Sequence, residues 1–171
     1  MDTSTTGRRD AHAYDELYRA CSSRLVGQLY LLTGDREEAR DCVQEALERA
    51  WVRWARVGQL HDPEAWVRTV ARNLSVSRWR RARNATTAWR RHASDDAFDG
   101  PDTGDRDALV AALRRLPLDQ RTAIVLHHLC DLDVSAVAAE TGASVTTVTS
   151  RLSRGRAALA AQLASTEGLS A

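Results

Sequence analysis

The feature that most constrains this chain is a strongly basic stretch with helical periodicity. Residues 65–94 contain eight arginines and no carboxylate. At about 100° per residue, a helix over residues 66–83 has an apolar arc, which consists of Trp66, Val67, Val70, Ala71 and Leu74. The opposite side carries Arg68, Arg72, Trp79, Arg80 and Arg83, with Asn73 and Val76 among them. One face can therefore be buried while the other presents guanidinium groups around an indole.

Such a polar face suits single-stranded nucleic acid. Guanidinium groups bind phosphates, and an indole ring can stack on an unpaired base, which contributes about 1–3 kcal/mol per base. Taken alone, the same pattern also fits an ordinary solvated helix face, so the rest of the chain has to decide between the two interpretations.

Charge is strongly segregated along the chain, although its formal net charge is only +1. Residues 35–48 are mostly acidic, and residues 95–107 carry six aspartates against one arginine. Local charge therefore indicates the partners better than net charge does. All the cationic residues are arginine, which we attribute mainly to a high-GC genome such as that of an actinobacterium.

The pattern predicts an all-α fold of two small helical domains joined by a flexible acidic linker. Residues 1–12 lack periodicity and are expected to form a disordered tail. The first domain, 13–83, should hold one helix ending at Thr33-Gly34, a second from Arg36 to Ala55, and a third that begins with Asp62 as N-cap and Pro63 at its first position. Residues 84–105 have the composition of a linker, and Trp89 within them has no assigned role.

The second domain, 106–164, has the pattern of a helix-turn-helix, and residues 165–171 form a tail. The sequence predicts three helices before the turn. The first contains Leu109 and Leu113, the second is capped by Asp119, and the third contains Val134 and Val137. Gly142 then makes a tight turn, and Ser144 can cap a last helix, 145–163.

This last helix combines an apolar face with a face of short hydroxyl side chains. The apolar set is Val145, Val148, Leu152, Gly155 and Leu159. The polar set is Thr146, Thr147, Ser150, Ser153 and Arg154, with Arg151 near the boundary. Serine, threonine and arginine suit base edges in the major groove. An ordinary solvent face is the alternative, but threonine and serine are poor helix formers and need another reason to be there.

Other classes of function find little support. The three cysteines lack the spacing of metal ligands, and Cys21 and Cys42 lie on apolar faces as expected of inert buried thiols. There is no signal peptide and no apolar run of membrane-spanning length, so we expect a cytoplasmic protein. No Gly-rich phosphate loop, HExxH, paired CxxC or GxSxG motif occurs. His61 and His92 are isolated, so we expect neither an enzyme nor a metal or cofactor.

Two long motifs, in order, resemble the extracytoplasmic-function sigma factors of bacterial RNA polymerase. The segments TGDREEARDCVQEALERAW and AWVRTVARNLSVSRWRRAR are similar to that family's region 2. The segment from LRRLPLDQRTAIVLHH to SRLSRGRAAL resembles its region 4. The resemblance implies a monomer that binds core RNA polymerase, melts the −10 promoter element and recognises the −35 duplex. A stand-alone helix-turn-helix regulator that binds duplex DNA as a dimer is the alternative.

The resemblance also implies roles for particular residues. Core polymerase would contact an acidic ridge made of Asp41, Gln44, Glu45 and Glu48. The opened −10 strand would contact Arg68, Arg72, Asn73, Trp79, Arg80 and Arg83, with His61 and Asp62 in the preceding connection. The −35 duplex would face Thr146, Thr147, Thr149, Ser150, Arg151, Ser153 and Arg154. The family usually has glycine in place of Thr146 and lysine or arginine in place of Thr149, so we expect either weaker −35 binding or recognition of a different sequence. An anti-sigma protein is a possible further partner.

Overall fold

Helices account for all the regular structure in residues 3–85 and 103–167, the part of the chain that the computed structural model describes. The chain divides into two units, residues 1–95 and 96–171. Within the described residues neither unit contains a strand, which confirms the predicted all-α class with two helical domains.

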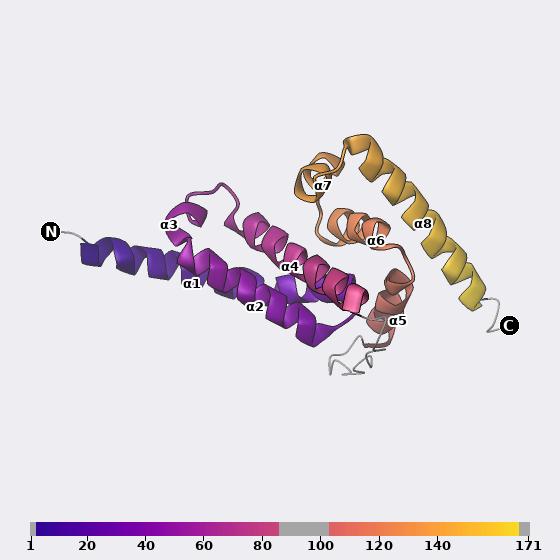
Figure 1. Ribbon diagram of the computed structural model, residues 1–171, viewed down its shortest axis with the longest axis horizontal. Coiled ribbons are helices and arrows are strands. Elements are labelled where there is room, and N and C mark those ends of the chain that lie inside the picture. Colours follow the sequence, from indigo (N-terminus) through magenta and orange to yellow (C-terminus); the bar gives the residue numbers. More distant parts are fainter. Residues whose placement is uncertain (1–2, 86–102, 168–171) are drawn as a thin grey trace. The chain divides into compact units, whose positions relative to one another are not determined.

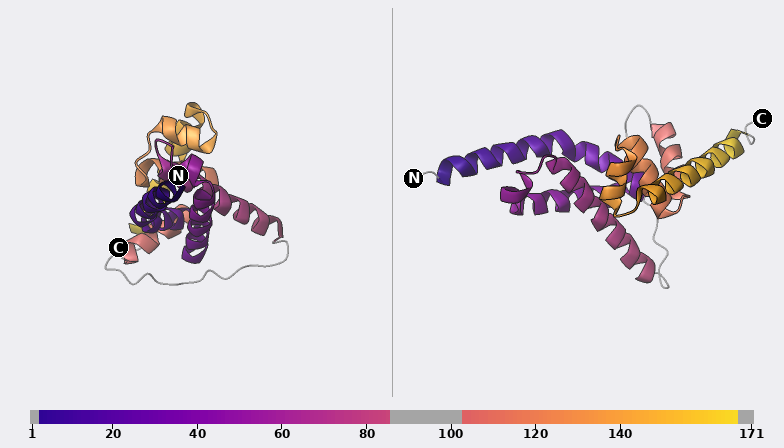
Figure 2. Two further views of the ribbon diagram at one scale, coloured as in Figure 1. Left: turned by 90° about the vertical axis from the view of Figure 1, so that its left-hand side faces the viewer. Right: turned by 90° about the horizontal axis from the view of Figure 1, so that it is seen from above.

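The first unit is built from α1 (Thr3–Thr33), α2 (Arg36–Val52), the single turn α3 (Trp54–Val57) and α4 (Pro63–Ala85). Helix α2 packs against both α1 and α4, and α4 also contacts α1. Figures 1 and 2 show these helices as a small bundle. Its core is apolar side chains from each helix, among them Leu25, Leu29, Val43, Leu47, Trp54, Val57, Val67, Ala71 and Leu74.

Short polar caps set the ends of these helices. Gly34, in the left-handed region at φ 71°, turns the chain after α1. Asp35 then caps α2, since its Oδ1 accepts a 2.9 Å hydrogen bond from the Glu38 amide. Asp62 Oδ1 accepts from the Ala65 amide at 2.9 Å, which confirms the predicted N-cap of α4. Each cap satisfies an amide that the first helical turn leaves without a partner.

Two predicted boundaries in this unit were wrong. The predicted tail 1–12 is helical from Thr3, because a nucleated helix gains one hydrogen bond for each added residue. The second helix does not reach Ala55. It stops at Val52, and Arg53 takes non-helical angles (φ −109°, ψ 21°). The chain restarts as α3, which leaves the Trp54 side chain only 8% exposed.

The second unit contains α5 (Thr103–Arg114), α6 (Leu118–Ile124), the π-helical turn η1 (Val125–Leu129), α7 (Val134–Thr141) and α8 (Val145–Glu167). Helix α8 packs on α5, α6 and α7. Gly155 permits the contact with α6, because a Cβ atom there would lie 2.9 Å from Ile124 Cγ1. Val148 and Leu152 are buried as predicted, whereas Val145 is 51% exposed and does not belong to the core.

The turn between α7 and α8 has the predicted helix-turn-helix features. Gly142 adopts φ 66°, which glycine tolerates without strain. The Thr147 amide donates to Ser144 Oγ at 3.1 Å, so Ser144 caps α8. The predicted cap by Asp119 was wrong. Pro117 precedes α6, and Asp119 lies inside its first turn, where its carboxylate binds Arg151 of α8 at 2.6 Å.

Helices extend into both ends of the predicted linker, residues 84–105, since α4 continues to Ala85 and α5 begins at Thr103. Residues 86–102, with Trp89, lie outside the described residues, as do residues 168–171 at the end of the predicted C-terminal tail. Helix α8 runs beyond the predicted 163 to Glu167.

Candidate nucleic-acid and partner interfaces

Helix α4 presents an exposed polar face on the side away from its buried arc. Asn73 and Arg80 are exposed, and the Trp79 side chain is 40% exposed despite its large apolar surface. Arg68 is half-buried. Arg83 lies on the same helix, but its side chain is outside the described residues. An exposed indole followed directly by an exposed arginine, with an exposed amide on the same helix, can stack on a base and bind a phosphate.

Arg72 does not lie on this exposed face, contrary to the prediction. It is only 8% exposed, and its Nη2 donates a 3.1 Å hydrogen bond to Asn73 Oδ1. A long arginine stem can pack against apolar neighbours while its guanidinium group reaches the edge of the buried region. Arg72 is therefore placed to orient the Asn73 amide.

The connection before α4 carries the two other predicted strand-binding residues. His61 and Asp62 are both exposed. The Asp62 carboxylate is already occupied as the N-cap of α4. Its position is consequently tied to the start of the helix that carries Asn73 and Trp79.

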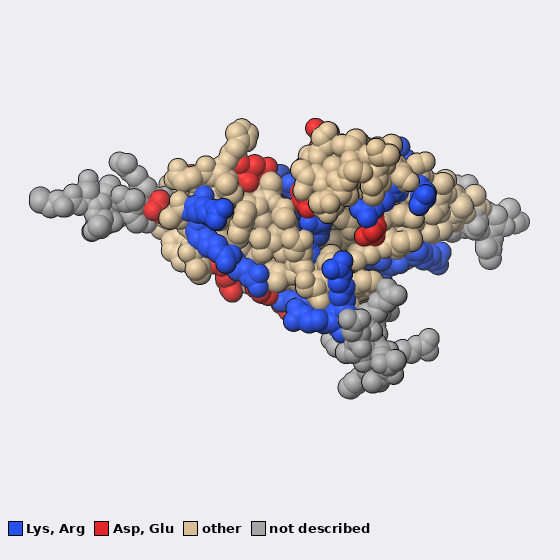
Figure 3. All heavy atoms as spheres, turned by 45° about the horizontal axis from the view of Figure 1, so that its top comes forward, with Lys and Arg blue, Asp and Glu red and all other residues tan. Residues whose placement is uncertain are grey.

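The acidic ridge, defined as Asp41, Gln44, Glu45 and Glu48, lies along α2. Asp41, Gln44 and Glu48 are exposed, and Gln44 Nε2 donates to Glu48 Oε1 at 3.2 Å. Glu45 is half-buried and differs from the others, because its carboxylate accepts hydrogen bonds from two arginines. In Figure 3, acidic side chains border arginine side chains on the surface, in keeping with such pairs.

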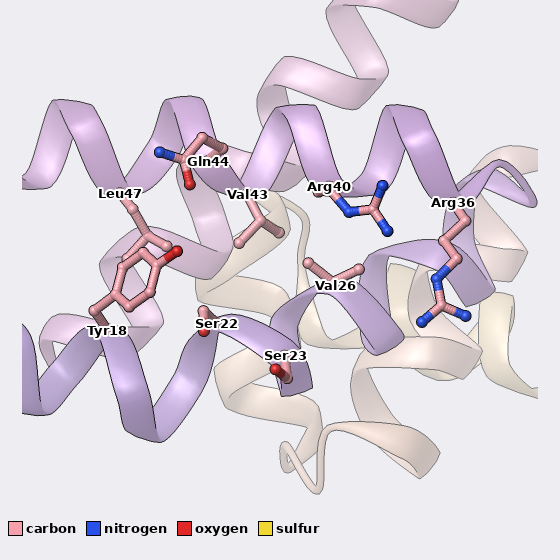
Figure 4. A pocket seen from close by; sticks show the side chains of 9 residues that line it. All are labelled: Tyr18, Ser22, Ser23, Val26, Arg36, Arg40, Val43, Gln44 and Leu47. Atoms are coloured by element: carbon pink, nitrogen blue, oxygen red, sulfur yellow. The ribbon is translucent and has the colours of Figure 1, made fainter. Parts of the chain in front are cut away.

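A pocket of about 320 Å³ lies between α1 and α2. Figure 4 shows Tyr18 beside Leu47 at one end and Arg36 with Arg40 at the other. Gln44 of the acidic ridge also lines this pocket. The sequence patterns did not indicate it, because it depends on how two helices separated by a turn pack side by side.

Helix α8 exposes most of the residues predicted to face duplex DNA. Thr146, Thr147, Thr149, Ser153 and Arg154 are exposed, and Ser150 and Arg151 are half-buried. Thr149 Oγ1 donates to its own helix at the Val145 carbonyl, 2.9 Å away. Arg151 is held by Asp119, as described above. The helix thus combines hydroxyl groups with an exposed arginine, which suits a major groove.

Comparison with known proteins identifies the family. The chain matches the model for Sigma-70 region 2 over residues 17–85 and the model for Sigma-70, region 4 over residues 106–159. It is 30% identical to the RNA polymerase sigma-E factor of Streptomyces avermitilis over 154 residues, which cover 89% of this chain and 86% of that protein. It is 33% identical over 164 residues to the ECF RNA polymerase sigma factor SigJ of Mycobacterium tuberculosis. The chain belongs to the extracytoplasmic-function sigma factors.

The match with SigJ covers 88% of this sigma factor but only about half, 51%, of the SigJ chain. Among solved structures, it resembles the sigma factor RpoE in complex with the anti-sigma factor NepR from Bartonella quintana. The TM-score is 0.69 at 25% identity, covering 88% of this chain and 96% of that one. Sigma factors direct promoter-specific initiation by RNA polymerase, and the comparisons do not favour the alternative of a stand-alone dimeric regulator.

The shifted pKa values of two cysteines and one histidine in this sigma factor have structural causes. Burial raises the pKa of the Cys21 and Cys42 thiols to about 11, and both side chains are fully buried. His128 accepts a 3.1 Å hydrogen bond from Arg156, and its pKa is lowered by burial and by His127 and Arg156. In the described parts of the chain no cluster of three potential metal ligands occurs, and no helix is long and apolar enough to cross a lipid bilayer.

Proposed function

We propose that this sigma factor uses three separate helical surfaces in promoter opening. The acidic ridge of α2 docks on core RNA polymerase, the exposed face of α4 binds the opened −10 strand, and α8 binds the −35 duplex. The main support for the proposal is that α4 and α8, which belong to different units, each expose amide or hydroxyl side chains together with arginine. The chain itself performs no catalysis in this scheme.

Strand capture would depend on Trp79, Arg80 and Asn73. Extruding a base from the stack costs a few kcal/mol. One base stacked on Trp79 contributes about 1–3 kcal/mol, so a phosphate contact from Arg80 and hydrogen bonds from Asn73 have to supply the remainder. We infer that Arg68 and Arg83 add charge to this face, that Arg72 holds Asn73, and that His61 and Asp62 line the approach to it.

Duplex binding would depend on the polar face of α8. Arg154 can contact guanine or phosphate, while Thr146, Thr147, Ser150 and Ser153 adapt to several base edges. Thr149 replaces the cation that the family usually has, and Arg151 is paired with Asp119, so we expect fewer phosphate contacts and weaker −35 binding than a cation at position 149 would provide.

We further propose that the protein is a monomer when free, works in the cytoplasm with polymerase, and is held by an anti-sigma protein. The support for the last partner is the likeness to RpoE, whose structure is a complex with NepR. The acidic ridge and the adjoining pocket between α1 and α2 are the surfaces at which such a partner would compete with polymerase.

Run-off transcription with core polymerase on a genomic promoter library tests the proposed function. We expect specific start sites that depend on this chain, and loss of most product with Asn73→Ala, Trp79→Ala or Arg80→Ala. Sedimentation should show a monomer. No association with core polymerase, undiminished initiation by these variants, or a stable dimer that binds promoter duplex tightly without polymerase would each contradict the proposal.

A further inference from the structure

The acidic ridge and the basic helix α4 are joined by one carboxylate. Glu45 Oε1 accepts a 2.6 Å hydrogen bond from Arg49 Nη2 on the same helix. Glu45 Oε2 accepts a 2.8 Å hydrogen bond from Arg78 Nη2 on α4, 33 residues along the chain. The side chains of Glu45 and Arg78 are 34% and 33% exposed, so the pair is shielded from full hydration but accessible to a partner.

Arg78 is not among the residues that the family resemblance assigns to the DNA strand, although it directly precedes Trp79. In the free protein its guanidinium group turns toward α2 and forms an ion pair there. A cation held by a carboxylate contributes little attraction for phosphate, because the two charges largely cancel at a distance. If Glu45 were engaged elsewhere, Arg78 would add a positive charge beside the stacking indole.

We propose that Arg78 is a further strand-binding cation, which Glu45 holds in the free protein and releases when a basic surface of polymerase engages Glu45. This inference rests on the proposed function of the ridge and of α4. In this proposal the Glu45 carboxylate couples docking on polymerase to binding of the strand. Because coupling between two binding events is reciprocal, a bound strand should strengthen docking by the same factor by which docking strengthens strand binding.

The test uses the full chain and a fluorescein-labelled oligothymidylate at low salt, where binding to phosphates is strongest. Glu45→Gln is nearly isosteric and mimics engagement of the carboxylate. We expect it to tighten binding roughly threefold and to steepen the dependence of log K on log salt by about 0.7, the slope of one additional phosphate contact on a single strand.

Two matched variants separate this effect from a general change in charge. Glu37→Gln also removes a carboxylate from α2, but Glu37 pairs with Arg40 of its own helix. For Glu37→Gln we expect a smaller gain in affinity for the oligonucleotide and an unchanged slope of log K against log salt. The gain from Glu45→Gln should disappear in an Arg78→Gln background and persist in an Arg81→Gln background, since Arg81 hydrogen-bonds the Ser77 carbonyl of its own helix.

Equal gains from Glu45→Gln and Glu37→Gln, a gain that survives Arg78→Gln, or no measurable binding by any variant at low salt would overturn the inference. A separate arm measures docking of the wild-type and Arg78→Gln chains on core polymerase, with and without the oligonucleotide. Failure of both chains to dock would contradict the proposed function. Docking that the strand strengthens equally in both chains would contradict only the role of Arg78.

Discussion

Arg72 and Asn73 are neighbours on α4, and the buried guanidinium group of the first donates a 3.1 Å hydrogen bond to the side-chain oxygen of the second. A hydrogen bond with one charged partner typically contributes about 1.5–3 kcal/mol when it is shielded from water. It restricts the rotamers of an otherwise exposed amide. In the proposed function, Arg72 is therefore the buried residue that positions Asn73, and Asn73 is the exposed residue that contacts the strand.

The first prediction follows from this pair. Arg72→Met keeps the buried stem and removes the hydrogen bond, so initiation in a run-off assay should fall by about tenfold and the free energy of unfolding by about 1.5 kcal/mol. The double variant with Asn73→Ala should be no worse than Asn73→Ala alone, because Arg72 acts through Asn73. Ser77→Ala, at another exposed position of α4, serves as the control. Losses that simply add would mean that Arg72 contacts DNA independently.

Asp62 allows a structural role to be separated from a role in binding DNA. Asp62→Ala removes the N-cap of α4 and should lower the free energy of unfolding by about 1 kcal/mol. Asp62→Asn retains an acceptor for the Ala65 amide and should cost much less, as measured by urea denaturation. If both variants are equally stable yet both impair initiation, Asp62 contacts the promoter rather than only capping the helix.

The regular part of this architecture was predictable because burial repeats with the helical period. Val67, Ala71 and Leu74 were predicted to face the core from spacing alone, and Asp62 and Ser144 were predicted as caps from their type and position. What depends on packing between helices was not predictable. Arg72 was placed on the wrong face, the pairing of Arg78 with Glu45 joins residues 33 apart, and the π-helical turn at Val125–Leu129 has no simple periodic signal.

Gly155 should be intolerant of a side chain. In Gly155→Ala the new Cβ would meet Ile124 Cγ1 at 2.9 Å, and overpacking of this kind usually costs about 1–3 kcal/mol of stability. Ile124→Val in the same chain removes Cδ1, which would lie 3.3 Å from the new Cβ, and should therefore restore only part of the loss. Gly142→Ala is the contrast. It has open space but a left-handed φ of 66°, so Ile124→Val should not rescue it. Thermal unfolding of the four variants measures both effects.

The buried thiols predict an unusual alkaline transition. Their folded pKa values of about 11 lie above the ordinary value of 9.0, so the unfolded chain loses these protons first as the pH rises. The stabilisation is complete below about pH 9 and is lost as the pH approaches 11, since the unfolded state then binds fewer protons than the folded one. The chain has 24 arginines and no lysine, so no lysine titrates in this window.

We expect urea denaturation to show falling stability between pH 8.5 and 10.5. The fall should be shallower in Cys42→Ala than in Cys130→Ala, whose thiol is only half-buried. Identical slopes in the two variants would show that Cys42 does not contribute to the transition.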